Sequence, residues 1–179
     1  MWTLALVRPL SYADPKEWSP EEASMIRIIP GDFSDPRVVD LLHIHVTSAR
    51  AESAPGSAHA LDITGLQSPY ISFWTIWDDE TLLGVGALKR LSDDHGEVKS
   101  MYTVQSFRRR GAGSAMLRHI IATARARGMS RLSLETGSWD YFLPAQALYR
   151  SHGFVECPPF ADYVLDSNSA FMSLDLRES

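Results

Sequence analysis

Residues 98–135 constrain the fold more than any other stretch of the chain. Two apolar runs with the character of strands enclose a turn that holds Gly111 and Gly113 and a helical pattern that ends at Gly128. This order predicts one βαβ unit with two parallel strands. Glycines at the start of the helix leave the first backbone amides and the positive end of the helix dipole unshielded, so the turn predicts an anion-binding site.

Positive charge gathers around the same turn. Between residues 98 and 134 the sequence holds 8 basic residues and no Asp or Glu, although the whole chain has 17 basic and 22 acidic residues and a net charge of −5. A compact basic patch suits a phosphate-bearing ligand, whereas the overall negative charge argues against a nucleic-acid partner. The alternative is that the turn only connects strand and helix, with the arginines on a solvated helix face.

Three types of phosphate-binding loop can be compared with this turn. A Walker-type loop requires Gly-Lys followed by Ser or Thr, which the sequence lacks. A dinucleotide loop requires a third glycine, where the chain has Met116, and an acid about 20 residues later at the end of a strand, whereas Glu135 follows the strand. The remaining pattern is R-x-x-G-x-G, from Arg108 to Gly113, at the start of a helix.

This pattern resembles the acyl-CoA signature of the GNAT family of N-acetyltransferases. Residues 132–135 and the segment AQALYRSHGF at residues 145–154 resemble further consecutive motifs of the family. The stretches GALK, GEVKSM and LSLETGS are similar to those of a bacterial subgroup of small acetyltransferases. Gln105 and Phe142 depart from the family, which often has Pro and Asn there. The resemblance implies an α+β fold with a mixed, mostly antiparallel, twisted sheet, splayed parallel central strands and flanking helices.

The remaining sequence fits one domain. A length of 179 residues with 45% hydrophobic content suits a single core. The Pro-containing residues 1–24 are expected to be an N-terminal extension, and residues 25–179 the N-acetyltransferase domain. Expected elements outside the βαβ unit are strands at 25–30, 71–77 and 82–91, a turn at 93–96, helices at 38–52 and between Pro144 and Gly153, a helical turn near 59–63, and closing strands at about 154–164 and 170–176; Ser34 is a candidate helix cap or turn residue.

Further features bear on location, partners and metals. The single cysteine, Cys157, fits a reducing compartment, and no run reaches the roughly 20 apolar residues of a membrane span. The sequence therefore predicts a cytoplasmic protein with no membrane partner. No metal site is expected, because His43 and His45 would point about 200° apart on a helix. A homodimer is expected, since many family members dimerise and the chain ends in the apolar run FMSLDL.

The resemblance implies that acetyl-CoA is the cofactor. In the family the pantetheine arm pairs with the exposed edge of the first parallel strand, here through the backbone of residues 101–103. The phosphates of the cofactor need donors clustered at one helix start, which the amides of residues 109–114 and three guanidinium groups provide. The expected cofactor-binding residues are Met101, Tyr102, Thr103, Arg108, Arg109, Arg110, Gly111, Ala112, Gly113, Ser114, Ala145 and Leu148.

Acyl transfer to an amine requires a neutral amine and a proton for the departing thiolate. Tyr149 matches the frequent acid of the family and shares a helix face with Ala145 and Leu148. The alternative is a core aromatic beside Phe154. Glu97 and Glu135, next to the parallel strands, are candidates for the base through water, although each can also be a solvated or hydrogen-bonded carboxylate.

The acceptor side is the least specified part of the sequence. Family resemblance suggests the loop with Trp139, Asp140 and Tyr141, together with Arg50, Glu52 and His59; the alternative is that the aromatic loop only caps the core. The expected function is acetyl transfer from acetyl-CoA to the primary amine of a small molecule, an amino acid or related metabolite, by direct attack in a ternary complex. The alternative is a family member that binds acyl-CoA or a protein partner without turnover.

Overall fold

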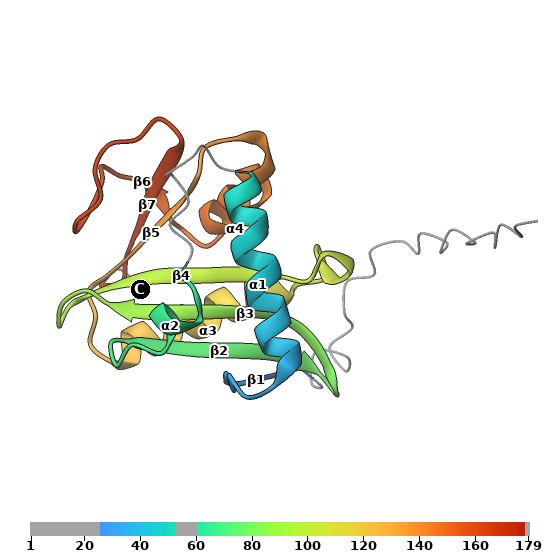
Figure 1. Cartoon of the computed structure of the whole chain (residues 1–179). Helices are drawn as coiled ribbons and strands as arrows, with labels where there is room; N and C mark the ends of the chain where they lie inside the picture. The colour runs from blue at the N-terminus through green and yellow to red at the C-terminus, as the bar shows by residue number, and fades with distance from the viewer. Residues whose placement is uncertain (1–25, 53–60, 178–179) are drawn as a thin grey trace, which may run out of the picture.

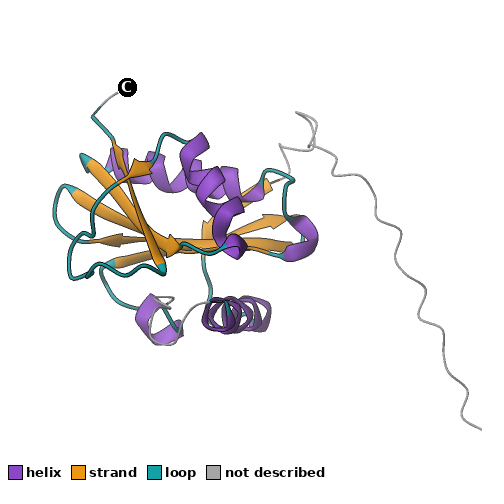
Figure 2. Cartoon of the chain, turned by 90° about the horizontal axis from the view of Figure 1, so that it is seen from above, coloured by secondary structure: helices purple, strands orange, loops and turns teal. Residues whose placement is uncertain are grey.

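In the described part of the chain, a single sheet carries helices on both faces (Figures 1 and 2). The computed structural model describes residues 26–52 and 61–177. Its 7-stranded sheet has the order β1-β2-β3-β4-β5-β7-β6, and all neighbours are antiparallel except β4 and β5, which are parallel. The predicted mixed, mostly antiparallel α+β fold is therefore confirmed.

The strands are β1 (Ile26–Pro30), β2 (Ile71–Asp78), β3 (Thr81–Arg90), β4 (His95–Thr103), β5 (Arg131–Gly137), β6 (Val155–Glu156) and β7 (Ser169–Asp175). The helices are α1 (Pro36–Ala51), α2 (Ile63–Leu66), α3 (Ala112–Ala126) and α4 (Leu143–Ser151), with 3-10 turns at η2 (Gln105–Phe107) and η3 (Asp140–Phe142). The elements of the βαβ unit, β4, α3 and β5, follow one another as the sequence predicts.

The first helix begins at a capping residue. Asp35 accepts a hydrogen bond from the amide of Arg37, and Pro36 takes the first helical position, where no amide is needed. Ser34 is a turn residue and not the cap, because its amide and hydroxyl both donate to Asp32. The helix therefore starts two residues before the predicted position 38.

Two sequence predictions touch residues that the structure does not describe. The helical turn expected near residues 59–63 forms later in the chain, as α2 (Ile63–Leu66), because Asp62 caps the helix by accepting a hydrogen bond from the amide of Gly65. His59 lies outside the described residues, and so does the whole predicted extension at 1–24. The division into an extension and a domain stays a prediction.

The turn before β4 is shorter than predicted. The predicted turn at 93–96 includes His95 and Gly96, whereas in the structure they are the first residues of β4. The reason is the backbone carbonyl of His95, which accepts hydrogen bonds from the amides of Leu91 and Ser92 at 2.9 and 3.1 Å. These bonds close the turn before residue 95 and let the strand start there.

The predicted closing strand at 154–164 is wrong beyond residue 156. Only β6 forms, and it pairs with β7 at the edge of the sheet. Pro158 and Pro159 have no amide hydrogen to donate, so the ladder cannot continue through them. Residues 157–168 instead form a long loop that returns to β7.

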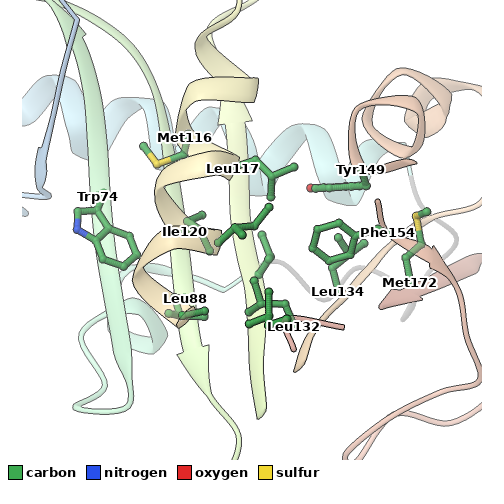
Figure 3. Close-up of a cluster of buried hydrophobic side chains, with 14 of the residues drawn as sticks. Trp74, Leu88, Met116, Leu117, Ile120, Leu132, Leu134, Tyr149, Phe154 and Met172 are labelled. Carbon is green, nitrogen blue, oxygen red and sulfur yellow. The ribbon is translucent and has the colours of Figure 1, made fainter. Parts of the chain in front are cut away.

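Two hydrophobic clusters hold the layers together. On one face, α3 packs on the sheet with Met116, Leu117 and Ile120, and α4 extends this cluster (Figure 3). On the other face, α1 and α2 contribute Val38, Leu41, Leu42 and Leu66. Each fully buried side chain of this size contributes about 1.5–3 kcal/mol. The two clusters fix the sheet between the helices, and with it the strands that line the candidate site.

Candidate active site

The parallel strands β4 and β5 separate after a short paired stretch. Beyond Glu97, β4 continues to Thr103 and β5 to Gly137 without pairing with each other. The edge of β4 that faces β5 therefore carries backbone groups with no strand partner there, and such an edge can accept an extended ligand as an added strand. The paired positions are His95 with Arg131, Gly96 with Leu132, and Glu97 with Ser133.

A bulge in β4 lies where the strands separate. The register of β3 and β4 shifts between Val85 and Ala87, and Ser100 of β4 has a φ of 51°. The Ser100 hydroxyl is buried and has no hydrogen-bond partner among the described residues. A buried unpaired hydroxyl costs about 1–3 kcal/mol, and strained or unsatisfied groups of this kind concentrate at functional sites.

The start of α3 is an uncapped helix terminus. Its N-cap is Gly111, with a φ of 91°, and no side chain caps the helix. The Ala115 amide donates to the carbonyl of Gly111, so the amides of residues 112–114 precede the first bonds of the helix. A Cβ at Gly111 would meet nothing within 4 Å. The open turn therefore presents free amides and the positive end of the helix dipole to an anion.

Gly113 brings three elements of the site together. A Cβ at this position would lie 3.3 Å from both Leu148 Cδ2 of α4 and Thr103 Oγ1 of β4. The free edge of β4, the start of α3 and the cofactor-facing residues predicted on α4 thus meet at one place. These features fit an acyl-CoA, which has an extended amide-bearing arm and phosphate groups.

The side chains around the turn divide between the two faces of the sheet. Met101 packs with the α3 cluster, whereas Tyr102 packs with the α1 cluster. The Arg108 guanidinium lies 5.5 Å from the Tyr102 ring, and its Nε donates to the carbonyl of Thr103 at 3.3 Å. Arg108 is therefore held beside the end of β4. Arg109 is exposed with a φ of 60°, and Arg110 lies over Phe107.

Ser114 connects α3 to α4 through its side chain. Its hydroxyl oxygen lies 2.8 Å from His152 Nε2 and accepts a hydrogen bond from Arg118 at 2.8 Å. His152 Nδ1 lies 2.9 Å from the carbonyl of Leu148. The sequence predicts that Ser114 binds the cofactor through its amide. The role of His152, which fixes α4 against the helix start, is visible only in the structure.

Tyr149 is buried, and its burial and a nearby carboxylate raise the pKa of its hydroxyl. Its side chain is 7% exposed, and its ring packs edge-on to Phe154 with centroids 5.8 Å apart (Figure 3). No group in the described part of the chain forms a hydrogen bond with its hydroxyl. Burial, and secondly the charge of Glu135, raise the pKa of Tyr149. The hydroxyl therefore keeps its proton at neutral pH, as a proton donor must.

The two candidate bases have different environments. Glu97 is 1% exposed, and its Oε1 accepts a hydrogen bond from the Tyr163 hydroxyl at 2.7 Å and lies 3.3 Å from Lys99 Nζ. Glu135 is half-buried and accepts a hydrogen bond from the Ser169 hydroxyl at 2.7 Å. Of the two carboxylates, Glu135 is the more accessible.

The predicted acceptor loop is tied to the loop before β7. Trp139 is 47% exposed, and its Nε1 donates to Asn168 Oδ1. Asp140 starts η3, and the 40% exposed Tyr141 contacts the ring of Phe142. Phe142 packs against Gly137, where a Cβ would lie 2.1 Å from the ring. Phe142 therefore has a packing role at the position where the family often has Asn.

The other residues predicted on the acceptor side do not contact the two candidate bases in the described part of the chain. Arg50 and Glu52 are exposed at the C-terminal end of α1. Within residues 26–52 and 61–177, neither forms a hydrogen bond or ion pair with Glu97 or Glu135. The predicted His59 lies outside those residues.

Two polar residues that contact Glu97, and a histidine that lies beside Tyr102, were not predicted as site residues from the sequence. Lys99 and Tyr163 contact the carboxylate, and His45 of α1 lies 5.1 Å from the Tyr102 ring. Burial, and secondly the charge of Lys99, lower the pKa of His45 to about 4. Strand alternation was a usable signal for Lys99, since residues two apart share a face.

The described residues hold neither a membrane-spanning helix nor a metal-binding cluster. Among the described residues, none of the helices combines the length and apolar character that crossing a membrane requires. The same residues contain no group of three or more His, Cys, Asp and Glu side chains that could hold a metal ion.

Comparison with known proteins identifies the family. Residues 38–154 match the model of the acetyltransferase (GNAT) family. The chain is 46% identical over 155 residues to the uncharacterised N-acetyltransferase YedL of Escherichia coli K12, covering 87% of this chain and 98% of YedL. The chain belongs to the GNAT family of acetyltransferases. The prediction of an acyl-CoA-dependent N-acetyltransferase is thereby confirmed.

Solved GNAT structures have the same fold. A Klebsiella pneumoniae protein described as an acyl-CoA N-acyltransferase superposes with a TM-score of 0.70 at 27% identity, covering 86% of this chain and 99% of that one. A Bacillus subtilis acetyltransferase crystallised in complex with CoA superposes with a TM-score of 0.62 at 19% identity, covering 84% and 98%. The second likeness concerns the fold alone. The sheet in which β4 and β5 separate is therefore a fold that this chain shares with other GNAT proteins.

Proposed function

We propose that the chain transfers the acetyl group of acetyl-CoA to the primary amine of a small molecule by direct attack in a ternary complex. The observation that carries this proposal is the meeting of three elements at Gly113, where the free edge of β4, the uncapped start of α3 and α4 converge. The B. subtilis protein of the same fold binds CoA, which supports the same ligand class here.

The cofactor would lie along β4 and the start of α3. The backbone of residues 101–103 offers amide and carbonyl groups to an extended arm, and the amides of residues 112–114 face the phosphates. Arg108, Arg109 and Arg110 add positive charge beside this turn. Bound acetyl-CoA would supply a thioester, whose carbonyl carbon forms the new C–N bond as its C–S bond breaks.

Tyr149 and Glu135 divide the proton transfers. An incoming ammonium loses one proton to Glu135, directly or through water, and becomes a nucleophilic amine. Tyr149 gives its proton to the departing sulfur and regains one from the acylated nitrogen. Glu135 releases to solvent the proton that it took from the ammonium, so both groups are restored after each turnover. Ser169 orients the Glu135 carboxylate. We assign the base to Glu135 because Glu97 is enclosed by Tyr163 and Lys99.

Glu135→Gln should lower kcat by about 10²-fold or more, because the amide cannot accept the ammonium proton. Glu97→Gln is the matched variant. It should lower the free energy of unfolding, since it leaves the buried Lys99 without its carboxylate, and its loss of kcat should be smaller than that of Glu135→Gln. Steady-state kinetics and thermal unfolding of both variants make the comparison. A larger kcat loss in Glu97→Gln would reverse the assignment of the base.

The proposed activity is tested by free-thiol release from acetyl-CoA across a panel of primary amines. Release that depends on the amine, with initial-rate lines that intersect when both substrates are varied, supports transfer in a ternary complex. Parallel lines, or an acetyl group left on the protein, would indicate a covalent intermediate. Binding of acetyl-CoA without turnover of any amine would instead favour the alternative, a binding module of the same fold.

We also propose that the enzyme is a cytoplasmic homodimer. Val155 on the edge strand β6, and Val164 and Leu165 in the following loop, are 66%, 78% and 84% exposed, and exposed apolar side chains of this kind suit a subunit contact. Light scattering should therefore report a dimer at micromolar concentration. The double variant Val164→Asp with Leu165→Asp should shift the monomer–dimer equilibrium toward the monomer. A monomeric wild-type protein would reject the proposal.

A further inference from the structure

Side-chain contacts tie α4, the helix that carries Tyr149, to three neighbouring elements. They join Gln146 to Gly137 of β5, Arg150 to Glu156 of β6, and His152 to Ser114 of α3. The helix has 9 residues, and no side chain caps its start. A short uncapped helix has little stability of its own, so these contacts and its packing decide where α4 lies. Of the three, the contact of His152 is the one that reaches the proposed cofactor turn.

The hydrogen bonds around His152 have a definite direction. The Arg118 guanidinium can only donate, so the Ser114 hydroxyl oxygen accepts from it at 2.8 Å. The carbonyl of Leu148 can only accept, so the His152 Nδ1 that lies 2.9 Å away carries a proton. In a neutral imidazole Nε2 is then the acceptor, and at 2.8 Å it receives the hydroxyl proton of Ser114. Donation therefore runs from α3 into α4.

This contact joins the proposed phosphate position to the residue proposed as proton donor. Ser114 is the third residue of α3, and its amide is one of those at 112–114 that precede the first helical bonds. On the other side, His152 ends α4, and its own amide donates to the carbonyl of Tyr149 at 3.0 Å. The backbone of Tyr149 is therefore one hydrogen bond away from His152, and His152 is one hydrogen bond away from Ser114.

We propose that His152 is a positioning residue, which holds Tyr149 at its working distance from acetyl-CoA through the contact with Ser114. The inference rests on the proposed function, in which Tyr149 protonates the departing sulfur. The start of α3 would hold the phosphates of the same molecule whose sulfur Tyr149 must reach. A shift of α4 against α3 would therefore change the distance between the hydroxyl and the sulfur, and a misplacement of about 1 Å can cost about 10²-fold in rate.

Two variants remove the contact from opposite sides. His152→Leu removes the imidazole, and Ser114→Ala removes the hydroxyl but keeps the amide proposed to face the phosphates. Each should lower kcat by about 10- to 100-fold, while the acetyl-CoA affinity stays close to that of the wild type. Glu156→Ala is the matched control, because it removes the exposed contact between α4 and β6 and should leave kcat unchanged. An equal kcat loss in Glu156→Ala, or a wild-type kcat in either of the first two variants, would overturn the inference.

Combining His152→Leu with Tyr149→Phe separates positioning from a general loss of structure. If His152 acts through the Tyr149 hydroxyl, its replacement should have little further effect on kcat once that hydroxyl is absent, because residues that act as a unit are not additive. A residue that only stabilises the fold would lower kcat by the same factor in both backgrounds, and that result would overturn the inference. Thermal unfolding of each variant records whether it is folded at the assay temperature.

A binding measurement tests the coupling between the cofactor turn and Tyr149 without turnover. ADP serves as the probe, because it has the pyrophosphate of CoA and lacks the arm that carries the sulfur. In protein with isotope-labelled tyrosine rings, ADP should shift the NMR signal of Tyr149, which is assigned by its loss in Tyr149→Phe. His152→Leu should still bind ADP in calorimetry, but the shift should largely disappear.

The outcomes for the inference and for the proposed function are distinct. If the shift depends on His152 while no amine is acetylated, the proposed function fails and the coupling stands. If amines are acetylated but the shift is absent in the wild type, or persists in His152→Leu, the coupling is overturned and the proposed function stands. If ADP does not bind to the wild type, the phosphates lie elsewhere and the inference is overturned.

Discussion

Replacing Gly111 with Glu should abolish acetyl-CoA binding. Gly111 has a φ of 91° and lies in open space at the start of α3, so a carboxylate there would face the position proposed for the phosphates. Like charges brought together at a binding surface cost several kcal/mol, which lowers the affinity by about 10²-fold or more. For the wild type, acetyl-CoA at about 100 times its Kd should stabilise the fold by about 2.7 kcal/mol and raise Tm by several degrees.

Gly128→Glu is the matched control for this variant. Gly128 follows the C-terminal end of α3 with a φ of 75°, and its Cβ would also meet nothing within 4 Å. Both substitutions therefore carry the same charge and a backbone cost of about 1–2 kcal/mol in the left-handed region. Gly128→Glu should keep the rise in Tm with acetyl-CoA and Gly111→Glu should lose it. Equal rises in both variants would place the phosphates elsewhere.

Tyr149→Phe should lower kcat by about 10²–10⁴-fold, the usual contribution of a general acid. The ring keeps its packing against Phe154, and the hydroxyl has no hydrogen bond to lose within residues 26–52 and 61–177. Thermal stability and acetyl-CoA affinity should therefore stay close to those of the wild type. Initial-rate kinetics and calorimetry on the same preparations measure both quantities.

Tyr70→Phe provides the control for the loss of a tyrosine hydroxyl. Tyr70 is 62% exposed and lies before β2, away from the proposed cofactor turn. Its replacement should leave kcat unchanged. If Tyr149→Phe also retained the wild-type kcat, Tyr149 would be a packing residue and the proton for the sulfur would come from water or another group.

The parts of the fold that local patterns encode were predictable from the sequence. Glycine at 111 and 128 marked the two ends of α3, and apolar periodicity marked the strands on either side. The prediction of a closing strand at 154–164 was wrong beyond residue 156. The apolar and aromatic residues after Phe154 are typical of a strand, but Pro158 and Pro159 lack the amide hydrogens that a strand ladder requires. The apolar composition of this segment favoured a strand, and the two prolines prevented one from forming.

The acceptor side was less predictable because it depends on contacts between distant residues. Tyr163 reaches Glu97 across 66 positions, from a loop with no regular pattern. The packing of Phe142 on Gly137 likewise becomes visible only when η3 and the end of β5 are placed together. Lys99 differs from these residues, because its spacing of two from Glu97 on one strand was a signal in the sequence that the prediction did not use.

Acetyl transfer to a small amine is tested most directly by following one reaction of acetyl-CoA with an amine by mass spectrometry while the free thiol is measured. We predict that each thiol released is matched by one acetyl group on the amine, with none on the protein, and that release stops when the amine is omitted. Thiol release without an acetylated amine, or release that Gly111→Glu leaves unchanged, would contradict transfer at this site.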